Sequence, residues 1–331
     1  MKICLIGCGS IAQAAHGPAL RRLQAEGTVS LSACCDMDGK RAEIFSKTFG
    51  FARFYTDYEQ MLRTEQPDAV FSLLPVRLNA ACAVRVLQLG YPVILEKPPG
   101  VDETEAMAIA EAAERGGLYH AVLFNRRSMP LTRKCLELLA GEEIEAVSLE
   151  MCREGRGGQE DFTTTAIHGI DCVRFLVGED YDCLDFAYQE DPGRCVNYYA
   201  YGKFTGGARV DMRFLPCAGA VTERIAIYTR GKQFYLNLPV WSGTTYVPGF
   251  DCPGSLVVAA GEREMLRVTG EELSGSRDGY VLNGFYDEDR LVLEAIAAGQ
   301  AAQFPVRQSL QPVDIAAAMR WRRPQYRKEN P

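Results

Sequence analysis

Residues 7–12 read Gly7-Cys8-Gly9-Ser10-Ile11-Ala12, and they decide the fold because of what flanks them. An apolar, strand-like run precedes them and a helix-compatible stretch, 11–23, follows, which predicts a strand, a glycine turn and a helix. Gly7 allows a tight turn, Gly9 lets a pyrophosphate approach the backbone, and Ala12 lets the helix lie close to its strand. The helix N-terminus favours an anion. We therefore expect a dinucleotide to bind at Gly7, Gly9, Ser10, Ile11 and Ala12.

A second strand-like run, 29–35, ends in Asp36. An acidic residue at this place accepts hydrogen bonds from the ribose hydroxyls of an adenosine and repels a 2′-phosphate, so it favours NAD over NADP. Two alternatives stay open. Asp36 could only cap the next helix, and Lys40 and Arg41 could still meet a 2′-phosphate, which keeps NADP possible.

Composition excludes several classes of protein. The net charge is −7 and no Lys/Arg run occurs, which argues against nucleic acid and anionic membranes as partners. No apolar stretch is long enough to span a bilayer. The first expected strand begins at Lys2 and leaves no room for a signal peptide, so we expect a cytoplasmic protein. The 12 cysteines are scattered without a CxxC pair and only 3 histidines occur, which predicts buried reduced thiols and no metal site.

Up to about residue 124, short apolar runs alternate with helical patterns. Strands are expected at 2–6, 29–35, 53–55, 69–74, 92–95 and 119–124. Alternating strands and helices predict a parallel, doubly wound sheet of the Rossmann type, whose ligands bind at the carboxyl ends of the strands. Leu74 and Pro75, which follow the fourth strand, are therefore expected to line the cofactor.

The pattern changes after residue 124. Helices are expected at 131–140, 163–177, 287–298 and 313–320, with strands at 143–153, 197–204, 208–215, 222–228 and 233–238 and an unstructured tail at 322–331. Successive strands without helices predict an antiparallel sheet. The 331 residues thus divide into an NAD(P)-binding Rossmann domain, 1–124, and an α+β domain with a large, mostly antiparallel, open-faced sheet, 125–331. The last helices could pack back on the first domain.

The fifth expected strand runs directly into Glu96-Lys97-Pro98. This triplet lies at the edge of the sheet where the nicotinamide end of the cofactor is expected, so Glu96 and Lys97 are candidate cofactor contacts. A lysine there serves as a general acid/base when partial burial lowers its pKa. The alternative is a surface lysine in a turn.

With these pieces the chain resembles the Gfo/Idh/MocA family, which includes glucose–fructose oxidoreductase and inositol dehydrogenase. The matching residues are Gly7-Cys8-Gly9-Ser10-Ile11-Ala12, Asp36, Glu96-Lys97-Pro98, Asn125-Arg126-Arg127 before Pro130, Ile167-His168-Gly169-Ile170-Asp171, and Gly284-Phe285-Tyr286 before Glu288. They keep the family's order over nearly the whole chain. The resemblance implies the two-domain plan and subunit pairing through the open sheet, so we expect a homodimer or homotetramer.

The resemblance also implies roles for single residues. Lys97 would contact the reacting hydroxyl or the nicotinamide ribose, and His168 would bind the substrate hydroxyl and assist proton transfer. Asp171 would orient His168 or serve the helix structurally. Substrate-binding candidates are Asn125, Arg126, Arg153 and Asp171, and the arginines could equally form salt bridges on a solvated rim.

Two departures from the family pattern matter. Relatives often carry an aspartate four residues before the histidine, where this chain has Thr164, which binds a hydroxyl but is not a carboxylate base. Asp161 could substitute. After the fourth strand the chain reads Pro75-Val76-Arg77 where many relatives have Pro-Asn and a histidine. Substrate contacts in that loop are therefore not carried over.

The resemblance implies an NAD(P)-dependent oxidoreductase that transfers a hydride between nicotinamide and a sugar, polyol or cyclitol-like substrate. Lys97, His168 and Thr164 would form its catalytic set. Two other classes stay open: a non-catalytic NAD(P)-binding regulatory protein, which Thr164 motivates, and an NAD-dependent lyase or glycosidase with no net redox change.

Overall fold

The computed structural model describes residues 1–156, 161–191, 195–239 and 253–328. The chain divides into two compact units, and each is described by itself. The first unit comprises Met1–Asn125 and Gly284–Val313, and the second comprises Arg126–Asn283 and Asp314–Pro331. A single domain boundary at 124/125 therefore does not describe the whole first unit, because the later segment Gly284–Val313 also belongs to it.

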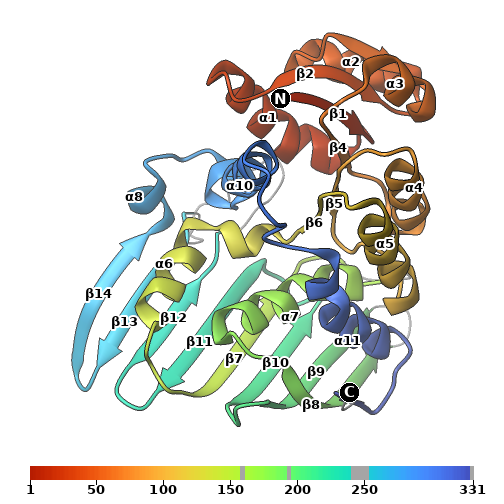
Figure 1. Cartoon of the computed structure of the whole chain (residues 1–331). Helices are drawn as coiled ribbons and strands as arrows, with labels where there is room; N and C mark the ends of the chain where they lie inside the picture. Colours follow the sequence, from red (N-terminus) through yellow and green to blue (C-terminus); the bar gives the residue numbers. More distant parts are fainter. Residues whose placement is uncertain (157–160, 192–194, 240–252, 329–331) are drawn as a thin grey trace. The chain divides into compact units, whose positions relative to one another are not determined.

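The first unit is built on a six-stranded sheet in the order β3-β2-β1-β4-β5-β6, with every pair of neighbours parallel (Figure 1). The strands are β1 (Lys2–Ile6), β2 (Ser30–Cys35), β3 (Arg53–Tyr55), β4 (Ala69–Ser72), β5 (Val93–Glu96) and β6 (His120–Leu123). Each lies within two residues of its expected bounds, so the doubly wound sheet is confirmed. The strand order reverses between β1 and β4, which places the ligand crevice at their carboxyl ends.

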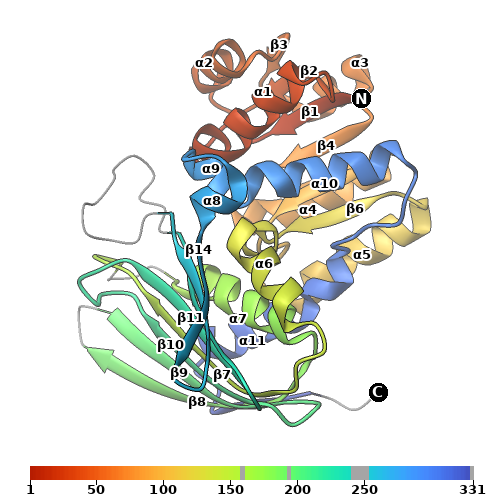
Figure 2. The same ribbon diagram turned by 90° about the vertical axis from the view of Figure 1, so that its left-hand side faces the viewer.

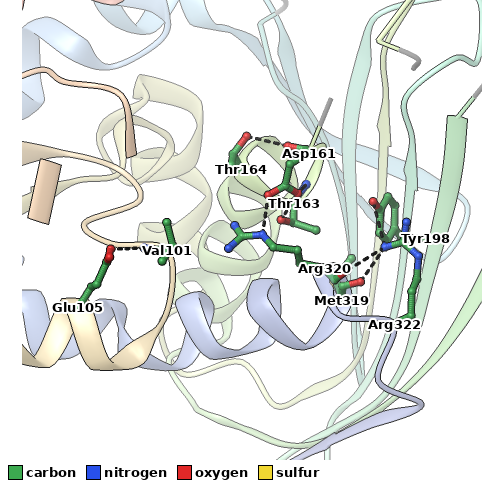
Figure 3. Close-up of polar contacts among 9 residues, drawn as sticks. All are labelled: Val101, Glu105, Asp161, Thr163, Thr164, Tyr198, Met319, Arg320 and Arg322. Atoms are coloured by element: carbon green, nitrogen blue, oxygen red, sulfur yellow. Dashed lines mark hydrogen bonds and ion pairs between the residues drawn. The ribbon is translucent and has the colours of Figure 1, made fainter. Parts of the chain in front are cut away.

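Helices connect these strands. They are the π-helical turn η1 (Ala12–His16), α1 (Gly17–Ala25), α2 (Gly39–Phe49), α3 (Tyr58–Glu65), α4 (Val76–Gln88), α5 (Glu103–Gly116), η2 (Asn125–Ser128), α10 (Phe285–Ala297), η3 (Val306–Ser309) and α11 (Leu310–Arg320), which crosses the boundary of the units. Side-chain caps begin several of them. Asp102 accepts the Glu105 N–H at 3.0 Å. The Glu105 carboxylate in turn accepts the Val101 N–H at 2.8 Å (Figure 3).

The second unit is built on a nine-stranded sheet in the order β14-β13-β12-β11-β7-β10-β9-β8-β15. Its strands are β7 (Ile144–Cys152), β8 (Tyr181–Asp191), β9 (Cys195–Phe204), β10 (Arg209–Leu215), β11 (Thr222–Thr229), β12 (Gln233–Asn237), β13 (Ser255–Ala260), β14 (Arg263–Thr269) and β15 (Gln325–Arg327). All pairs are antiparallel except β7 with β10. The mostly antiparallel sheet is thus confirmed.

Helices cover one face of this sheet. The unit's helices are α6 (Pro130–Leu139), α7 (Thr163–Val177), α8 (Gly270–Ser274) and α9 (Gly279–Leu282), and Figure 2 shows α6 and α7 against the same face. The helix α7 lies so close that a Cβ on Gly169 would come within 2.6 Å of the Leu149 side chain. Side chains alternate along β10, where Val210 and Met212 are buried and Arg209 is exposed, so the other face is open in the single chain.

Some expectations need correction. The tail forms β15, where Tyr326 pairs with Leu184 of β8. The strands β8, β13 and β14 were not among the individual strands expected from the sequence. The 11 cysteines in the described part of the chain are all free thiols, yet Cys217 is exposed and Cys183 and Cys195 are half-buried, so burial does not hold for all. Cys252 lies outside the described residues.

Two further observations concern the described residues only. None of their helices has the length and apolar character needed to cross a membrane. They also contain no group of three or more His, Cys, Asp or Glu side chains arranged to hold a metal ion.

Candidate functional site

The glycine turn after β1 has the geometry that its sequence predicts. Gly7 has φ +95°, and a Cβ there would lie 2.7 Å from the Leu73 carbonyl oxygen, so only glycine fits. A Cβ on Gly9 would meet no described atom within 4 Å, so packing within the protein does not require this glycine. Close approach of a pyrophosphate does require it, and the residues of the turn therefore fit a dinucleotide.

Asp36 lies at the end of β2 and is bound to the glycine turn. Its carboxylate accepts the Cys8 N–H at 2.9 Å and the Asp38 N–H at 2.9 Å. The helix α2 is capped instead by Asp38, which accepts the N–H groups of Lys40 and Arg41, so Asp36 is not the cap. The Arg41 guanidinium lies 3.5 Å from Asp36 and 3.6 Å from Asp38.

A cavity of about 650 Å³ opens beside this carboxylate, a volume in the usual range for ligand sites. Of the expected cofactor residues, its lining includes Gly7, Gly9, Asp36, Leu74 and Pro75. It does not include Ser10, Ile11, Ala12, Glu96 or Lys97. The lining brings together the ends of β1, β2 and β4, as expected for the point where the strand order reverses.

Lys97 directly follows β5, and the peptide before it is held at both ends. The Asn79 side chain donates to the Glu96 carbonyl oxygen at 2.8 Å, and the Lys97 N–H donates to the Glu96 carboxylate at 3.0 Å. Ser72, at the end of β4, donates to the Asn79 side chain at 2.8 Å. The sheet edge therefore fixes where the Lys97 side chain leaves the backbone.

The second unit carries the expected histidine on α7. His168 is only 8% exposed. The Thr164 hydroxyl donates to the Asp161 carbonyl oxygen at 2.9 Å, near the start of the helix (Figure 3). The Asp161 carboxylate accepts the Thr163 N–H at 3.0 Å and the Arg320 guanidinium at 2.5 Å. Asp161 thus anchors the helix start, and this engagement speaks against its replacing the missing catalytic aspartate.

Asp171 forms a buried ion pair with Arg127. The guanidinium donates to both carboxylate oxygens, at 2.7 and 2.5 Å, and the two side chains are 1% and 4% exposed. Of the two roles left open for Asp171, these contacts favour the structural one, and we do not carry Asp171 forward as a substrate contact.

Arg126 and Arg153 share one carboxylate. Arg126 donates to Glu223 at 2.9 and 2.6 Å, and Arg153 donates to the same side chain. Burial alone would raise the pKa of Glu223, but the charges of the two arginines lower it to about 2. The three charges sum to one positive charge at the ends of β7 and β11. Salt bridges on a solvated rim were one of the two alternatives for the arginines; the salt bridge forms, but its three side chains are largely buried. Asn125, at the start of η2, is 3% exposed.

Comparison with known proteins identifies the first unit. Residues 1–124 match the model of the Gfo/Idh/MocA oxidoreductases, a family with an NAD-binding Rossmann fold. The family match spans these residues, which are less than half of the chain. Inositol 2-dehydrogenase of Burkholderia lata is 26% identical over 254 residues, covering 72% of this chain and 74% of that protein. Other curated relatives match over 42% to 50% of their length, so the chain spans about half of them.

Solved structures share the fold over nearly the whole length of the chain. A family oxidoreductase from Vibrio cholerae has a TM-score of 0.80 at 23% identity and 97% coverage of both chains. KijD10, a 3-ketoreductase from Actinomadura kijaniata in complex with NADP and TDP-benzene, has a TM-score of 0.76 at 19% identity and 96% coverage of both. At these identities the likeness shows the fold alone.

Sequence reasoning missed several polar residues at this site. Asn79 was given no role in the sequence analysis, although it lies in the segment that follows the fourth strand. Glu223, His16 and Asp289 gave no local signal, because each meets its partners only in the folded chain. Their roles come from the structure alone.

We expect Asp36→Ser to shift cofactor preference from NAD towards NADP, because it removes the negative charge beside the expected adenosine ribose. Charged hydrogen bonds contribute about 1.5–3 kcal/mol, so NAD affinity should fall by roughly tenfold to a hundredfold. Calorimetric titration with both cofactors measures this. The control is Asp57→Ser, which keeps a capping residue on α3 and lies outside the cavity lining. An unchanged NAD/NADP ratio in Asp36→Ser contradicts the assignment.

We expect Asp171→Asn to destabilise the protein by about 3–5 kcal/mol, because it leaves the Arg127 charge buried without its partner. Urea denaturation measures the loss. The matched control is Asp180→Asn, whose pairs with Arg174 and Lys328 are half-buried and still reach water, so they should contribute less, about 1 kcal/mol. Equal losses in the two variants would contradict the importance of burial.

Proposed function

We propose that the chain is an NAD(P)-dependent oxidoreductase acting on a CH–OH group of a sugar, polyol or cyclitol-like substrate. The observation that carries this proposal is the position of Lys97 directly after the carboxyl end of β5, where hydrogen bonds hold the preceding peptide group. The dinucleotide cavity lies at the same edge of the sheet. A relative that matches the chain over 254 residues is an inositol 2-dehydrogenase, which supports this substrate class.

Bound nicotinamide would supply the hydride acceptor or donor. Lys97 would take the proton of the reacting hydroxyl during oxidation and return it during reduction. Its side chain is half-buried. The held peptide before it limits the positions that the amine can reach.

Substrate contacts are proposed for the second unit. His168 would bind the reacting hydroxyl and share the proton role. Thr164 already donates its proton to a backbone carbonyl, so its oxygen would serve a substrate only as an acceptor. Asn125 and the positive charge shared by Arg126 and Arg153 would bind polar or anionic substituents.

NAD is the proposed cofactor in preference to NADP. The Asp36 carboxylate is held beside the cavity by two backbone N–H groups, so its charge faces the place of the ribose. Arg41 is the opposing feature, because it lines the same cavity and lies near both aspartates. A cytoplasmic location stays a prediction from the sequence.

We expect Lys97→Ala to lower turnover by about 10²–10⁴-fold while leaving cofactor affinity nearly unchanged, because a general acid–base group contributes about this factor. NAD(P)H absorbance with a panel of polyols, aldoses, cyclitols and sugar acids measures turnover in both directions. The control is Lys47→Ala, which removes an exposed lysine paired with Glu43 on α2. Near-native turnover of Lys97→Ala would exclude the proposed proton role.

The same panel separates the alternatives. Net NADH formation or consumption supports the oxidoreductase. Tight cofactor binding without product supports a regulatory protein. Product without net change in NADH supports a lyase or glycosidase that uses the cofactor transiently.

The open face of the nine-stranded sheet is the proposed subunit interface. It carries exposed aromatic side chains, since Tyr201 of β9 is 44% exposed and Tyr235 of β12 is 38% exposed. A shallow hollow of about 220 Å³ lies on this face, lined by Glu150, Arg213 and Tyr235 among others. We expect light scattering to give a homodimer or homotetramer. A monomer at micromolar concentration would contradict this.

A further inference from the structure

The helix after the glycine turn begins with an unusual backbone. Residues Ala12–His16 form a π-helical turn, in which the Gly17 N–H donates to the Ala12 carbonyl oxygen five residues earlier. Such turns are rare and occur frequently at functional sites. The turn ends on His16, which is 0% exposed. A histidine is thus buried two turns or less from the expected pyrophosphate.

His16 is bonded at both ring nitrogens. Its Nδ1 lies 2.9 and 3.0 Å from the two carboxylate oxygens of Asp289, and its Nε2 lies 3.1 Å from the Glu96 carboxylate. The Phe285 ring packs edge-on against the imidazole, with ring centroids 5.3 Å apart. These contacts join the glycine-turn helix, β5 and α10, three elements that lie far apart in the sequence.

The geometry suits an imidazolium. An ionised carboxylate is an acceptor only, so both ring nitrogens donate when Asp289 and Glu96 are ionised. Burial alone lowers the pKa of His16. Asp289 and Glu96 raise this pKa to about 10, through their negative charges and their hydrogen bonds to the ring. His16 therefore stays charged at neutral pH and holds both carboxylates in place.

Glu96 transmits this constraint to Lys97. One oxygen of its carboxylate faces His16, and the other accepts the Lys97 N–H at 3.0 Å. The carbonyl of the same peptide group is held by Asn79. Without His16, the Glu96 side chain would lose the donor that fixes its orientation, and the Lys97 N–H would lose a fixed acceptor.

We propose that His16 is a positioning residue for the acid/base lysine: through Glu96 it fixes the direction in which Lys97 leaves β5, relative to the glycine turn that holds the cofactor. This inference rests on the proposed role of Lys97. It goes beyond that role because it assigns a task to the buried cluster of His16, Glu96 and Asp289.

The test compares His16→Gln with a matched control, His120→Gln. Both N–H donors of glutamine lie on one nitrogen, so they do not reproduce the separate donors Nδ1 and Nε2 with which His16 bonds Asp289 and Glu96. His120 is a half-buried histidine at the start of β6; its Nδ1 faces only the Leu118 carbonyl oxygen at 3.3 Å, and it pairs with Val93, at the other end of β5 from Glu96. Its replacement should leave Lys97 unaffected.

The first measurement is amide hydrogen exchange by NMR in the whole chain, which needs no substrate. In His16→Gln, exchange of the Lys97 amide should accelerate roughly tenfold more than that of Ile94 and Leu95 in the same strand, whereas His120→Gln shows no such difference. Equal acceleration at all three amides would mean that His16 only stabilises the unit, and this would overturn the proposal.

The second measurement separates kcat from cofactor binding, at a temperature where circular dichroism shows the variants folded. In His16→Gln, kcat should fall about tenfold or more while the NAD dissociation constant changes less than about threefold, because a misplaced acid/base group impairs the chemical step. A native kcat would also overturn the proposal. Should Lys97→Ala retain turnover, the proposed proton role of Lys97 fails, while the exchange measurement still decides whether His16 positions the Lys97 backbone.

Discussion

The first unit depends on one close approach of backbone to backbone, at Gly7. A Cβ on this residue would collide with the Leu73 carbonyl oxygen after β4, and the Gly7 N–H donates to the Cys35 carbonyl oxygen at the end of β2. The end of β1 is therefore tied to both neighbouring strands at the point where the strand order reverses. The cavity beside Asp36 follows from this constraint, because three strand ends meet there.

Buried charges then connect the functional residues to the scaffold. Charges removed from water are tolerated only when they are paired, so each buried pair specifies which elements must meet. His16 joins Glu96 and Asp289 in the first unit. Arg127 joins Asp171 in the second, on the helix that carries His168. In each unit the proposed acid/base residue lies within a few residues of such a cluster along the chain.

The sequence predicted what local patterns encode. Gly7 and Asp36 could be assigned to the cofactor because their roles depend on a strand, a turn and a strand end, all readable within a few residues. Lys97 could be placed at the sheet edge for the same reason. The sequence could not decide whether Arg126 binds substrate or forms a salt bridge, because its partner Glu223 lies 97 residues away on β11. It could not decide the role of Asp171 either, because the partner Arg127 lies 44 residues away.

By itself, the sequence determined the parallel sheet, the glycine turn and the family resemblance, because hydrophobic periodicity and glycine positions act over short stretches of chain. The tertiary structure alone decided which polar groups pair. It brought Asp289 to His16 across 273 residues, and it engaged Asp161 with Arg320 across 159. The reason is physical: a buried charge is satisfied by whichever donor the folded chain brings within about 3 Å, and no local pattern encodes that partner.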